Sequence, residues 1–303
     1  MNYGKKSVKQ KKKALQSTSS KLGRKCLLTF SKVLLLCVIA IGIIGICAGL
    51  GVFKGIIDSA PTITLEDATP TRYSSFIYDS KGNQMAKLIA EDSNRVPVTM
   101  DQIPTDLANA FVAIEDERFY QHNGIDIMGI LRAGVTAVKT GFKRQEGAST
   151  ITQQLIKNNV LGGGNEDNWG DRIERKIQEQ YLALQLDKSM SKELIITNYL
   201  NTINLGNNTL GVKVAAKRYF NKDVSDLTLS ECTVLASITK NPSRLNPISG
   251  RENNAERRRI VLQYMYEQGY ITKAQQEEAL ADDVYDRIQN VDTAAKGTNS
   301  PYS

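Results

Sequence analysis

An uninterrupted apolar run near the start of the chain dominates its pattern of hydrophobic and polar positions. Val33 to Phe53 is free of charge and lies between Lys32 and Lys54. At a rise of about 1.5 Å per residue, this run forms a helix of about 31 Å, the thickness of a bilayer's hydrocarbon core. It is longer than the apolar part of a cleavable signal peptide. We therefore predict a retained transmembrane helix over residues 33–53, with a cleaved signal or a buried core helix as the alternatives.

A short strand–turn–strand pattern follows the connector that begins at residue 54. Phe76 to Tyr78 favours a strand, residues 79–83 favour a turn, and Met85 to Ile89 favours a returning strand. The pattern predicts a small β-hairpin within residues 54–100. We interpret this hairpin as a structural pedestal for the domain that follows.

Apolar residues recur at helical spacing through most of the sequence after Pro104. This spacing predicts helices over residues 104–114, 124–140, 149–158, 172–186, 192–200, 210–220, 228–239 and 256–268. Residues 162–170 are rich in glycine and predict a loop. The predicted fold is therefore mainly α, with a main domain over residues 101–285. Residues 286–303 lose the periodicity and predict a linker or the start of a following domain.

Charge is distributed unevenly, which changes the meaning of the formal net charge of +7. Residues 1–32 hold ten Lys and Arg and no acid, so residues 33–303 hold 29 basic and 32 acidic residues, a net charge of −3. The basic residues form a tail beside the predicted span. They mark the N-terminal side as cytoplasmic and the main domain as extracellular. A main domain with this balance is not expected to bind nucleic acid.

Cysteine and histidine are scarce beyond the predicted span. Cys232 is the only cysteine there, and His122 is the only histidine of the chain. An intradomain disulfide and a zinc site of the usual type are therefore not expected.

An acidic group, Glu115 to Glu117, ends an apolar segment that begins at Leu107. Glu115 and Phe119 share a helical face at i,i+4 spacing if the helix continues that far. An acid on such a face is partly desolvated, which suits it for proton transfer near neutral pH. The alternative is an acidic helix end that is simply solvated.

Four polar residues form a predicted stripe on the next helix. Thr150, Gln153, Gln154 and Lys157 fall at i, i+3, i+4 and i+7, so they share one face. A row of hydroxyl, amide and ammonium donors suits an oligosaccharide or an anion. The alternative is a solvated polar face.

A third polar group lies on the predicted helix 172–186. Arg172, Arg175 and Lys176 carry positive charge close to Glu179. Such a cluster suits a pyrophosphate, because arginine offers a planar fork of donors to phosphate oxygens. The alternative is a ladder of intrahelical salt bridges, which contributes only a few tenths of a kcal/mol per pair.

Five segments in order carry a family resemblance. They are Glu115-Asp-x-x-Phe-x-x-His-x-Gly124, Gly147-x-Ser-Thr-Ile-Thr-Gln-Gln154, Arg175-Lys-x-x-Glu179, Lys192-x-x-Ile-Ile-x-x-Tyr-Leu-Asn201 and Gly211-x-x-x-Ala-Ala-x-x-Tyr-Phe220. The set resembles the signature motifs of the peptidoglycan glycosyltransferases, glycosyltransferase family 51. That family occurs in class A penicillin-binding proteins and in monofunctional transglycosylases. The resemblance covers about residues 73–285.

The resemblance implies a lysozyme-like, two-lobed fold with a membrane-embedded lip. It also implies polymerisation of lipid II into glycan strands, with inversion at the anomeric carbon and release of undecaprenyl pyrophosphate. Glu115 matches the general base for the acceptor 4-hydroxyl. Glu179 matches the second glutamate, near the pyrophosphate or a divalent cation, Mg²⁺ or Mn²⁺. The matched substrate-binding residues are Asp116, Phe119, Ser149, Thr150, Gln153, Gln154, Lys157, Asn158, Arg172, Arg175, Lys176 and Asn201.

The implied partners are lipid II, the growing glycan chain, the membrane and other cell-wall synthesis proteins, with no nucleic acid. We also expect no transpeptidase motif in this chain, as in a truncated class A protein or a transglycosylase with an extended tail. Two other functions are weighed against transfer. A lysozyme-like lytic enzyme would also use a glutamate, but it would not need the cations. A non-catalytic membrane-anchored scaffold would need neither.

Overall fold

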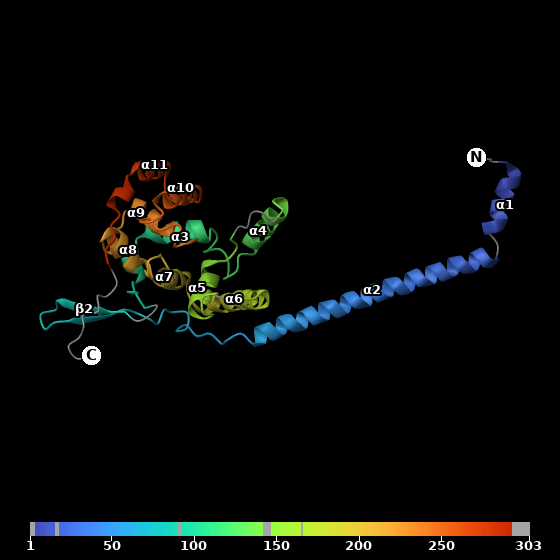
Figure 1. Cartoon of the computed structure of the whole chain (residues 1–303), viewed down its shortest axis with the longest axis horizontal. Helices are drawn as coiled ribbons and strands as arrows, with labels where there is room; N and C mark the ends of the chain where they lie inside the picture. The colour runs from blue at the N-terminus through green and yellow to red at the C-terminus, as the bar shows by residue number, and fades with distance from the viewer. Residues whose placement is uncertain (1–3, 16–17, 90–92, 142–146, 165, 293–303) are drawn as a thin grey trace. The chain divides into compact units, whose positions relative to one another are not determined.

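The chain divides into two compact units, Met1–Ser59 and Ala60–Ser303. The computed structural model describes residues 4–15, 18–89, 93–141, 147–164 and 166–292. We call the two parts the N-terminal unit and the main unit (Figure 1). Each is described by itself.

The N-terminal unit consists of two helices, α1 (Lys5–Leu15) and α2 (Thr18–Asp58). The segment Leu22–Asp58 of α2 is long and apolar enough to cross a membrane, and none of its most apolar window is buried in protein. Apolar side chains that no protein covers need another apolar environment, which a bilayer supplies. The predicted span of residues 33–53 lies inside α2, and the helix extends beyond it at both ends.

The predicted hairpin is present at the start of the main unit. Strands β1 (Ser75–Tyr78) and β2 (Gln84–Leu88) pair antiparallel, with Phe76 opposite Lys87. The turn between them is held by Asp79, whose carboxylate accepts the N–H groups of Lys81 and Asn83. An aspartate that bonds the backbone two residues on is a common way to close a turn.

The rest of the main unit is mainly helical, as predicted. Short 3₁₀ segments are η1 (Met100–Gln102), η2 (Val224–Asp226) and η3 (Val284–Arg287). The α-helices are α3 (Thr105–Glu115), α4 (Ile127–Lys139), α5 (Ile151–Asn159), α6 (Trp169–Ser189), α7 (Lys192–Thr202), α8 (Val212–Phe220), α9 (Leu229–Ala236), α10 (Arg251–Glu267) and α11 (Lys273–Ala281).

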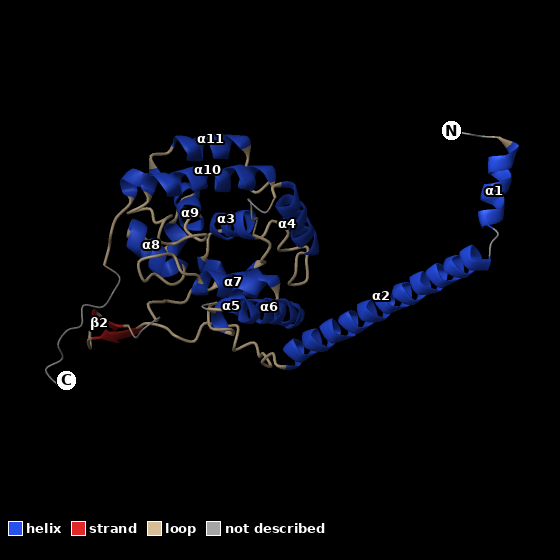
Figure 2. Ribbon diagram, turned by 45° about the vertical axis from the view of Figure 1, so that its right-hand side comes forward, coloured by secondary structure: helices blue, strands red, loops and turns tan. Residues whose placement is uncertain are grey.

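Two groups of helices build the main unit. In the first, α3 packs on α9 and α10, and α11 covers α10; in the second, α5 packs on α6 and α7 (Figure 2). Helix α8 contacts both α7 and α9 and so joins the groups. A continuous apolar core runs through both of them, with Phe111, Leu155 and Tyr199 among its fully buried side chains. The C-terminal end of α3 meets the start of α5 where the two groups adjoin, because the carboxylate of Asp116 accepts the N–H of Ile151.

Three expectations need correction. Helix α3 ends at Glu115, so Glu115 and Phe119 do not share a helical face. The chain continues to pack beyond residue 285, because the N–H groups of Gln289 and Val291 donate to carbonyls of α8. Helix α11 was not predicted, because its sequence lacks a clear apolar stripe. Residues 293–303 of the predicted linker lie outside the described residues.

The apolar stripe of α4 is exposed in the described structure. Its apolar side chains are between 39% and 71% exposed: Ile127, Met128, Ile130, Leu131, Val135 and Val138. Their spacing places them on one side of the helix. A contiguous exposed apolar face of this kind marks a surface that contacts a membrane or another partner.

Candidate active site

Glu115 occupies the last position of α3, and three segments far apart in the sequence converge on its carboxylate. Oε2 accepts the side-chain amide of Gln154 on α5 at 3.0 Å. Oε1 accepts the hydroxyl of Thr239, which follows α9, and lies 3.5 Å from Nη2 of Arg257 on α10. The side chain is 14% exposed. Glu115 is therefore held in a fixed orientation while part of it still reaches solvent.

The turn after Glu115 is built by Asp116, His122 and Gly124. Asp116 leaves the helical conformation, and its buried carboxylate accepts the main-chain N–H of Ile151 at 2.9 Å and contacts Nε2 of His122 at 2.9 Å. Nδ1 of His122 accepts the N–H of Gly124. His122 thus supports the shape of the turn. Asp116 ties the end of α3 to the first residue of α5. Its negative charge also interacts favourably with the positive end of the α5 helix dipole.

Gly124 allows α6 to approach this turn. Its φ is +89°, in the left-handed region that favours glycine. A Cβ at this position would lie 2.3 Å from the carbonyl oxygen of Ala183 on α6. The glycine is therefore required for both its backbone conformation and the close packing of α6.

The predicted polar stripe on α5 is divided in the structure. Thr150 is the N-cap of α5, and it forms a reciprocal capping box with Gln153. The Thr150 hydroxyl also donates to the carbonyl of Gly124 at 2.7 Å. Thr150 and Gln153 are buried, and the Thr150 hydroxyl and the Gln153 Oε1 are used by the fold. Gln154 and Lys157 are the less buried donors of the stripe, and the binding of a ligand by these four residues stays a prediction.

The third polar group forms around Glu179 of α6, whose side chain is 1% exposed. Arg175 Nη1 donates to one carboxylate oxygen, and Lys176 Nζ donates to the other. Lys176 also reaches the Ser149 hydroxyl at 3.2 Å, so α6 is tied to the segment before α5. A buried carboxylate between two cations is well compensated, and each cation keeps further N–H donors.

Lys157 lies close enough to both carboxylates to feel their charge. Its side chain is half-buried, and its ammonium makes no hydrogen bond or ion pair with another described residue. Burial lowers the pKa of the Lys157 ammonium, and the negative charges of Glu179 and Glu115 offset only part of that shift. An unpaired, partly desolvated cation binds an anionic ligand more strongly than a solvated surface lysine does.

Four other predicted residues lie apart from these carboxylates. Phe119 is fully buried, with the Lys192 ammonium 4.6 Å from its ring centre. The side-chain amide of Asn201 is used by the main chain of Val98, to which it both donates and accepts. Asn158 and Arg172 are exposed. These contacts give Phe119 and Asn201 a place in the core, and the substrate-binding role of all four stays a prediction.

Thr239, Arg257 and Glu166 take part in the site although no sequence pattern singled them out. Glu166 accepts a hydrogen bond from Nε of Arg175 at 2.7 Å while Glu179 accepts one from Nη1, so the guanidinium bridges the two carboxylates. Thr239 is separated from Glu115 by 124 positions in the sequence. The spacing of residues within one helix cannot report a contact made across the fold.

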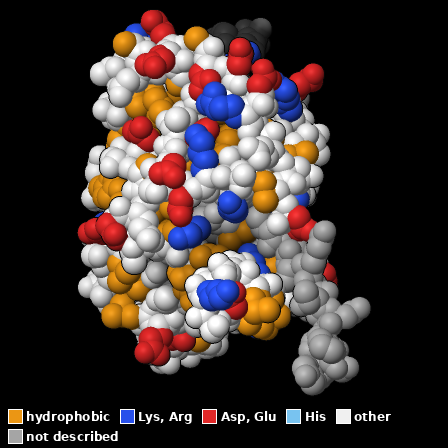
Figure 3. Space-filling view, turned by 90° about the vertical axis from the view of Figure 1, so that its left-hand side faces the viewer, with side chains coloured by type: hydrophobic (Ala, Val, Ile, Leu, Met, Phe, Trp, Pro, Cys, Tyr) orange, Lys and Arg blue, Asp and Glu red, His pale blue; other side chains and the backbone are white. Residues whose placement is uncertain are grey.

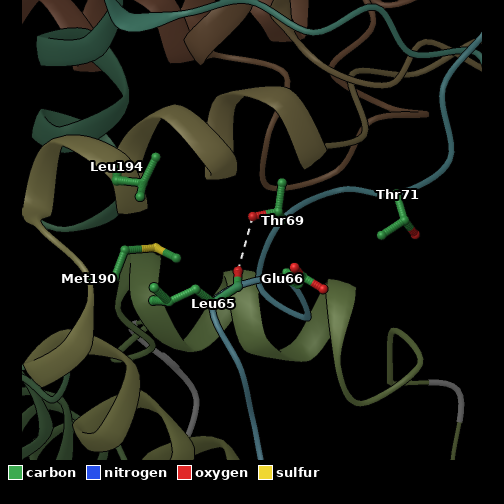
Figure 4. Close-up of a pocket in the computed structure, with 6 residues that line it drawn as sticks. All are labelled: Leu65, Glu66, Thr69, Thr71, Met190 and Leu194. Carbon is green, nitrogen blue, oxygen red and sulfur yellow. Dashed lines mark hydrogen bonds between the residues drawn. The ribbon is translucent and has the colours of Figure 1, made fainter.

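A cavity of about 340 Å³ lies away from both carboxylates (Figure 4). Its lining comes from the connector, from the residue that follows α6 and from the start of α7: Leu65, Glu66, Thr69, Thr71, Met190 and Leu194. The Thr69 hydroxyl donates to the Leu65 carbonyl at 3.0 Å and closes the connector turn beside it. Neither Glu115 nor Glu179 lines this cavity.

We expected no transpeptidase motif in this chain, but the Ser-x-x-Lys spacing of such a motif is present. Ser-x-x-Lys occurs twice, at Ser189–Lys192 and at Ser237–Lys240. Both serine hydroxyls donate to carbonyls of their own helices, Ser189 to Leu186 and Ser237 to Thr233. Ser237 is fully buried, and Lys192 pairs with Asp187 at 2.6 Å. Neither tetrad therefore presents a free nucleophile beside its lysine.

The chain belongs to the transglycosylase family, because the family model described as "Transglycosylase" matches residues 81–266. The matched segment includes α3, α5 and α6 and so both carboxylate groups.

Curated proteins that the chain resembles include penicillin-binding proteins 1A from several bacteria. It is 42% identical to that of Clostridium perfringens over 259 residues, which is 83% of this chain and 36% of the relative. It is 36% identical to that of Streptococcus oralis over 273 residues, covering 90% of this chain and 42% of the relative. The chain also matches a crystal structure of penicillin-binding protein 1A from Haemophilus influenzae, at 23% identity and a TM-score of 0.38. The match covers 74% of this chain and 22% of the chain in the crystal structure. The chain spans between 28% and 42% of the length of the curated relatives it matches.

Proposed function

We propose that the main unit is a peptidoglycan glycosyltransferase that polymerises lipid II into glycan strands and releases undecaprenyl pyrophosphate. The observation that carries the proposal is the arrangement on α5. Gln154 binds the carboxylate of Glu115, and Lys157, one turn further, is an unpaired cation near Glu179. Helix α5 thus contacts the proposed base at the end of α3 through Gln154 and carries a cation near Glu179 of α6, as transfer from a pyrophosphate donor requires.

Glu115 serves as the general base in this proposal. Its carboxylate accepts the proton of the acceptor 4-hydroxyl as that oxygen forms a bond to the anomeric carbon of the donor. The bond from that carbon to the pyrophosphate oxygen breaks, and the oxygen leaves with the electron pair. Attack from the side opposite the leaving group inverts the anomeric carbon. Thr239, Gln154 and Arg257 hold the carboxylate in place for this transfer.

Lys157, Arg175 and Lys176 stabilise the leaving pyrophosphate. Charge develops on the departing oxygen in the transition state, and fixed cations in a partly desolvated site lower its energy. Glu179 keeps Arg175 and Lys176 in position through one hydrogen bond from each. The Ser149 hydroxyl accepts a further hydrogen bond from Lys176. In this role Glu179 is a positioning residue.

A divalent cation does not fit around Glu179 as the residues stand. Mg²⁺ and Mn²⁺ prefer several oxygen ligands. Both oxygens of Glu179 accept hydrogen bonds from cationic side chains, and the described residues contain no group of three or more His, Cys, Asp or Glu that could hold a metal ion. The proposed reaction therefore takes no step through a metal.

Two apolar surfaces support the proposal that the substrate is lipid-linked. Helix α2 has the length and composition of a membrane span, and α4 exposes a stripe of apolar side chains from the main unit. A polyprenyl substrate stays in the bilayer, so the enzyme that uses it must work at the membrane surface. We propose that the basic N-terminal tail is cytoplasmic and that the catalytic domain, residues 101–285, is extracellular. The growing glycan and other cell-wall synthesis proteins are its proposed partners.

The test is polymerisation of lipid II by the full chain in detergent or bilayers. Wild type is expected to form polymer, Glu115→Gln to form none, and Glu179→Gln to be strongly impaired, all with unchanged helical content. Glu117→Gln is the matched control, because Glu117 is an exposed acid two residues from Glu115. Polymerisation by Glu115→Gln at the wild-type rate would show that the base assignment is wrong. Release of fragments from finished peptidoglycan would support the lytic alternative, and a wild type without either activity would support a scaffold.

A further inference from the structure

We propose that α1 is a docking helix for anionic lipid headgroups, which holds the N-terminal segment on the surface of the membrane that α2 crosses. The proposal goes beyond glycosyl transfer and does not depend on it. It rests on α2 being a membrane span and on the charge, exposure and position of α1.

Five of the six lysines of α1 gather on one side of the helix, and Lys11 lies on the other side. Lys5, Lys9 and Lys12 are spaced i, i+4 and i+7, and Lys6 and Lys13 lie next to this row. All of these lysines are exposed. Val8 and Leu15, seven positions apart, form an apolar edge beside the row and are 54% and 73% exposed. A basic face with an adjoining apolar edge is typical of a helix that lies in a membrane interface.

Nothing within the N-terminal segment neutralises this charge. Residues 1–32 contain no acid, so no i,i+4 ion pair can form on α1. Lys9 instead has like charges at Lys5 and Lys13, and such pairs destabilise a helix. Lys5 and Lys6 also place positive charge at the N-terminus, where the helix dipole is unfavourable to cations. A helix of 11 residues is marginal by itself in water. An anionic surface against the lysine row removes the repulsion and so favours the helix.

The position of α1 selects lipid as the source of that negative charge. Helix α2 begins at Thr18, three positions after Leu15, and its charge-free part begins at Val33. The helix from Thr18 to Lys32 is only about 22 Å long, so α1 stays tethered near the headgroups. Basic segments immediately beside a span bind anionic lipids through this proximity. Nucleic acid would need to be captured from solution, and the main unit does not extend the basic surface. Acidic and basic side chains are interspersed on the face that Figure 3 shows.

The test compares the full chain in nanodiscs of phosphatidylcholine with nanodiscs that also contain phosphatidylglycerol. Amide hydrogen exchange is measured over residues 5–15. We expect exchange to be about tenfold slower with phosphatidylglycerol at low salt, and the difference to vanish near 1 M salt, where the Debye length is about 3 Å. Lys→Gln at Lys5, Lys6, Lys9, Lys12 and Lys13 should abolish the difference. Lys→Arg at the same positions should keep it, because the charge is retained.

Exchange in α2 serves as the internal control, because its protection reports insertion and should be equal in every sample. Equal exchange over residues 5–15 in both kinds of nanodisc would overturn the proposal. Slow exchange that survives in the Lys→Gln variant would overturn it too, because charge would then not be the cause. Protection by an added oligonucleotide in phosphatidylcholine discs, without any by phosphatidylglycerol, would instead identify nucleic acid as the partner. The readout is independent of polymerisation, so it separates this proposal from the proposed function.

Discussion

The carboxylate of Asp116 accepts the main-chain N–H of Ile151 at 2.9 Å, which fixes the first turn of α5 to the end of α3. We predict that Asp116→Ala destabilises the main unit. The N–H of Ile151 would remain buried without a partner, which costs about 1–3 kcal/mol. This corresponds to a fall of several degrees in Tm for a domain of this size. The measurement is thermal unfolding followed by circular dichroism.

The matched control is Glu117→Ala at the next position. Glu117 is 44% exposed and pairs with Arg132, so its removal should change stability by less than about 1 kcal/mol. An equal loss of Tm in both variants would contradict the role given to the Asp116–Ile151 hydrogen bond.

Gly124→Ala is predicted to destabilise the main unit more strongly than an ordinary glycine substitution. The alanine would adopt a φ of +89° and place its Cβ 2.3 Å from the carbonyl oxygen of Ala183. Strain and overlap together should cost more than about 1 kcal/mol. Gly134→Ala in α4 is the matched control, because a Cβ there meets nothing within 4 Å. It should stabilise the protein by about 0.4–1 kcal/mol. Both values come from Tm, and a neutral Gly124→Ala would show that α6 can move away from the turn.

The elements with strong periodicity could be predicted from the sequence, whereas contacts across the fold could not. The apolar run of α2, the hairpin and most helices follow from spacing that each segment carries by itself. Helix α11 has no clear apolar stripe, and its signal is the Thr272–Gln275 capping box. Thr150 and Gln153 form a capping box of the same kind at the start of α5. This box explains why these two residues of the predicted polar stripe bond to the main chain of the fold. Thr239 carries no local signal, because its role arises only when α9 packs on α3.

Thr239→Val is predicted to lower kcat for polymerisation by about tenfold, with KM changed less than about twofold. The hydroxyl donates to Glu115 Oε1, and a hydrogen bond to a charged group contributes about 1.5–3 kcal/mol. Its loss leaves the carboxylate free to rotate, which affects the proton transfer more than substrate binding. Steady-state kinetics with lipid II provide the measurement. Thr239→Ser retains a hydroxyl and should restore most of the rate. A failure of the serine variant to restore it would indicate that packing, and not the hydrogen bond, matters.

Lys157 is predicted to set an alkaline limit on activity. Burial lowers the pKa of its ammonium below the usual value of 10.5, so the cation proposed to stabilise the leaving group is lost at a lower pH than for a surface lysine. The lowered pKa also means that the folded state binds this proton less tightly than the unfolded state. The free energy of unfolding therefore increases as the pH rises from the folded-state pKa of Lys157 towards its unfolded-state pKa. Deprotonation of Lys157 thus does not unfold the protein in this pH range, and unfolding is not the cause of the expected loss of activity.

The measurement for Lys157 is the pH profile of kcat/KM with lipid II. Lys157→Arg should keep activity and move the alkaline limit to higher pH, because a guanidinium stays protonated. Lys157→Met should lower kcat by about 10²–10³-fold at neutral pH, as expected for the loss of one charge-stabilising group. Its Tm should not fall by more than a few degrees, since Lys157 makes no ion pair with another described residue. An alkaline limit that stays in place in Lys157→Arg would mean that another group titrates, and Lys157 would then not be the cation that governs departure of the pyrophosphate.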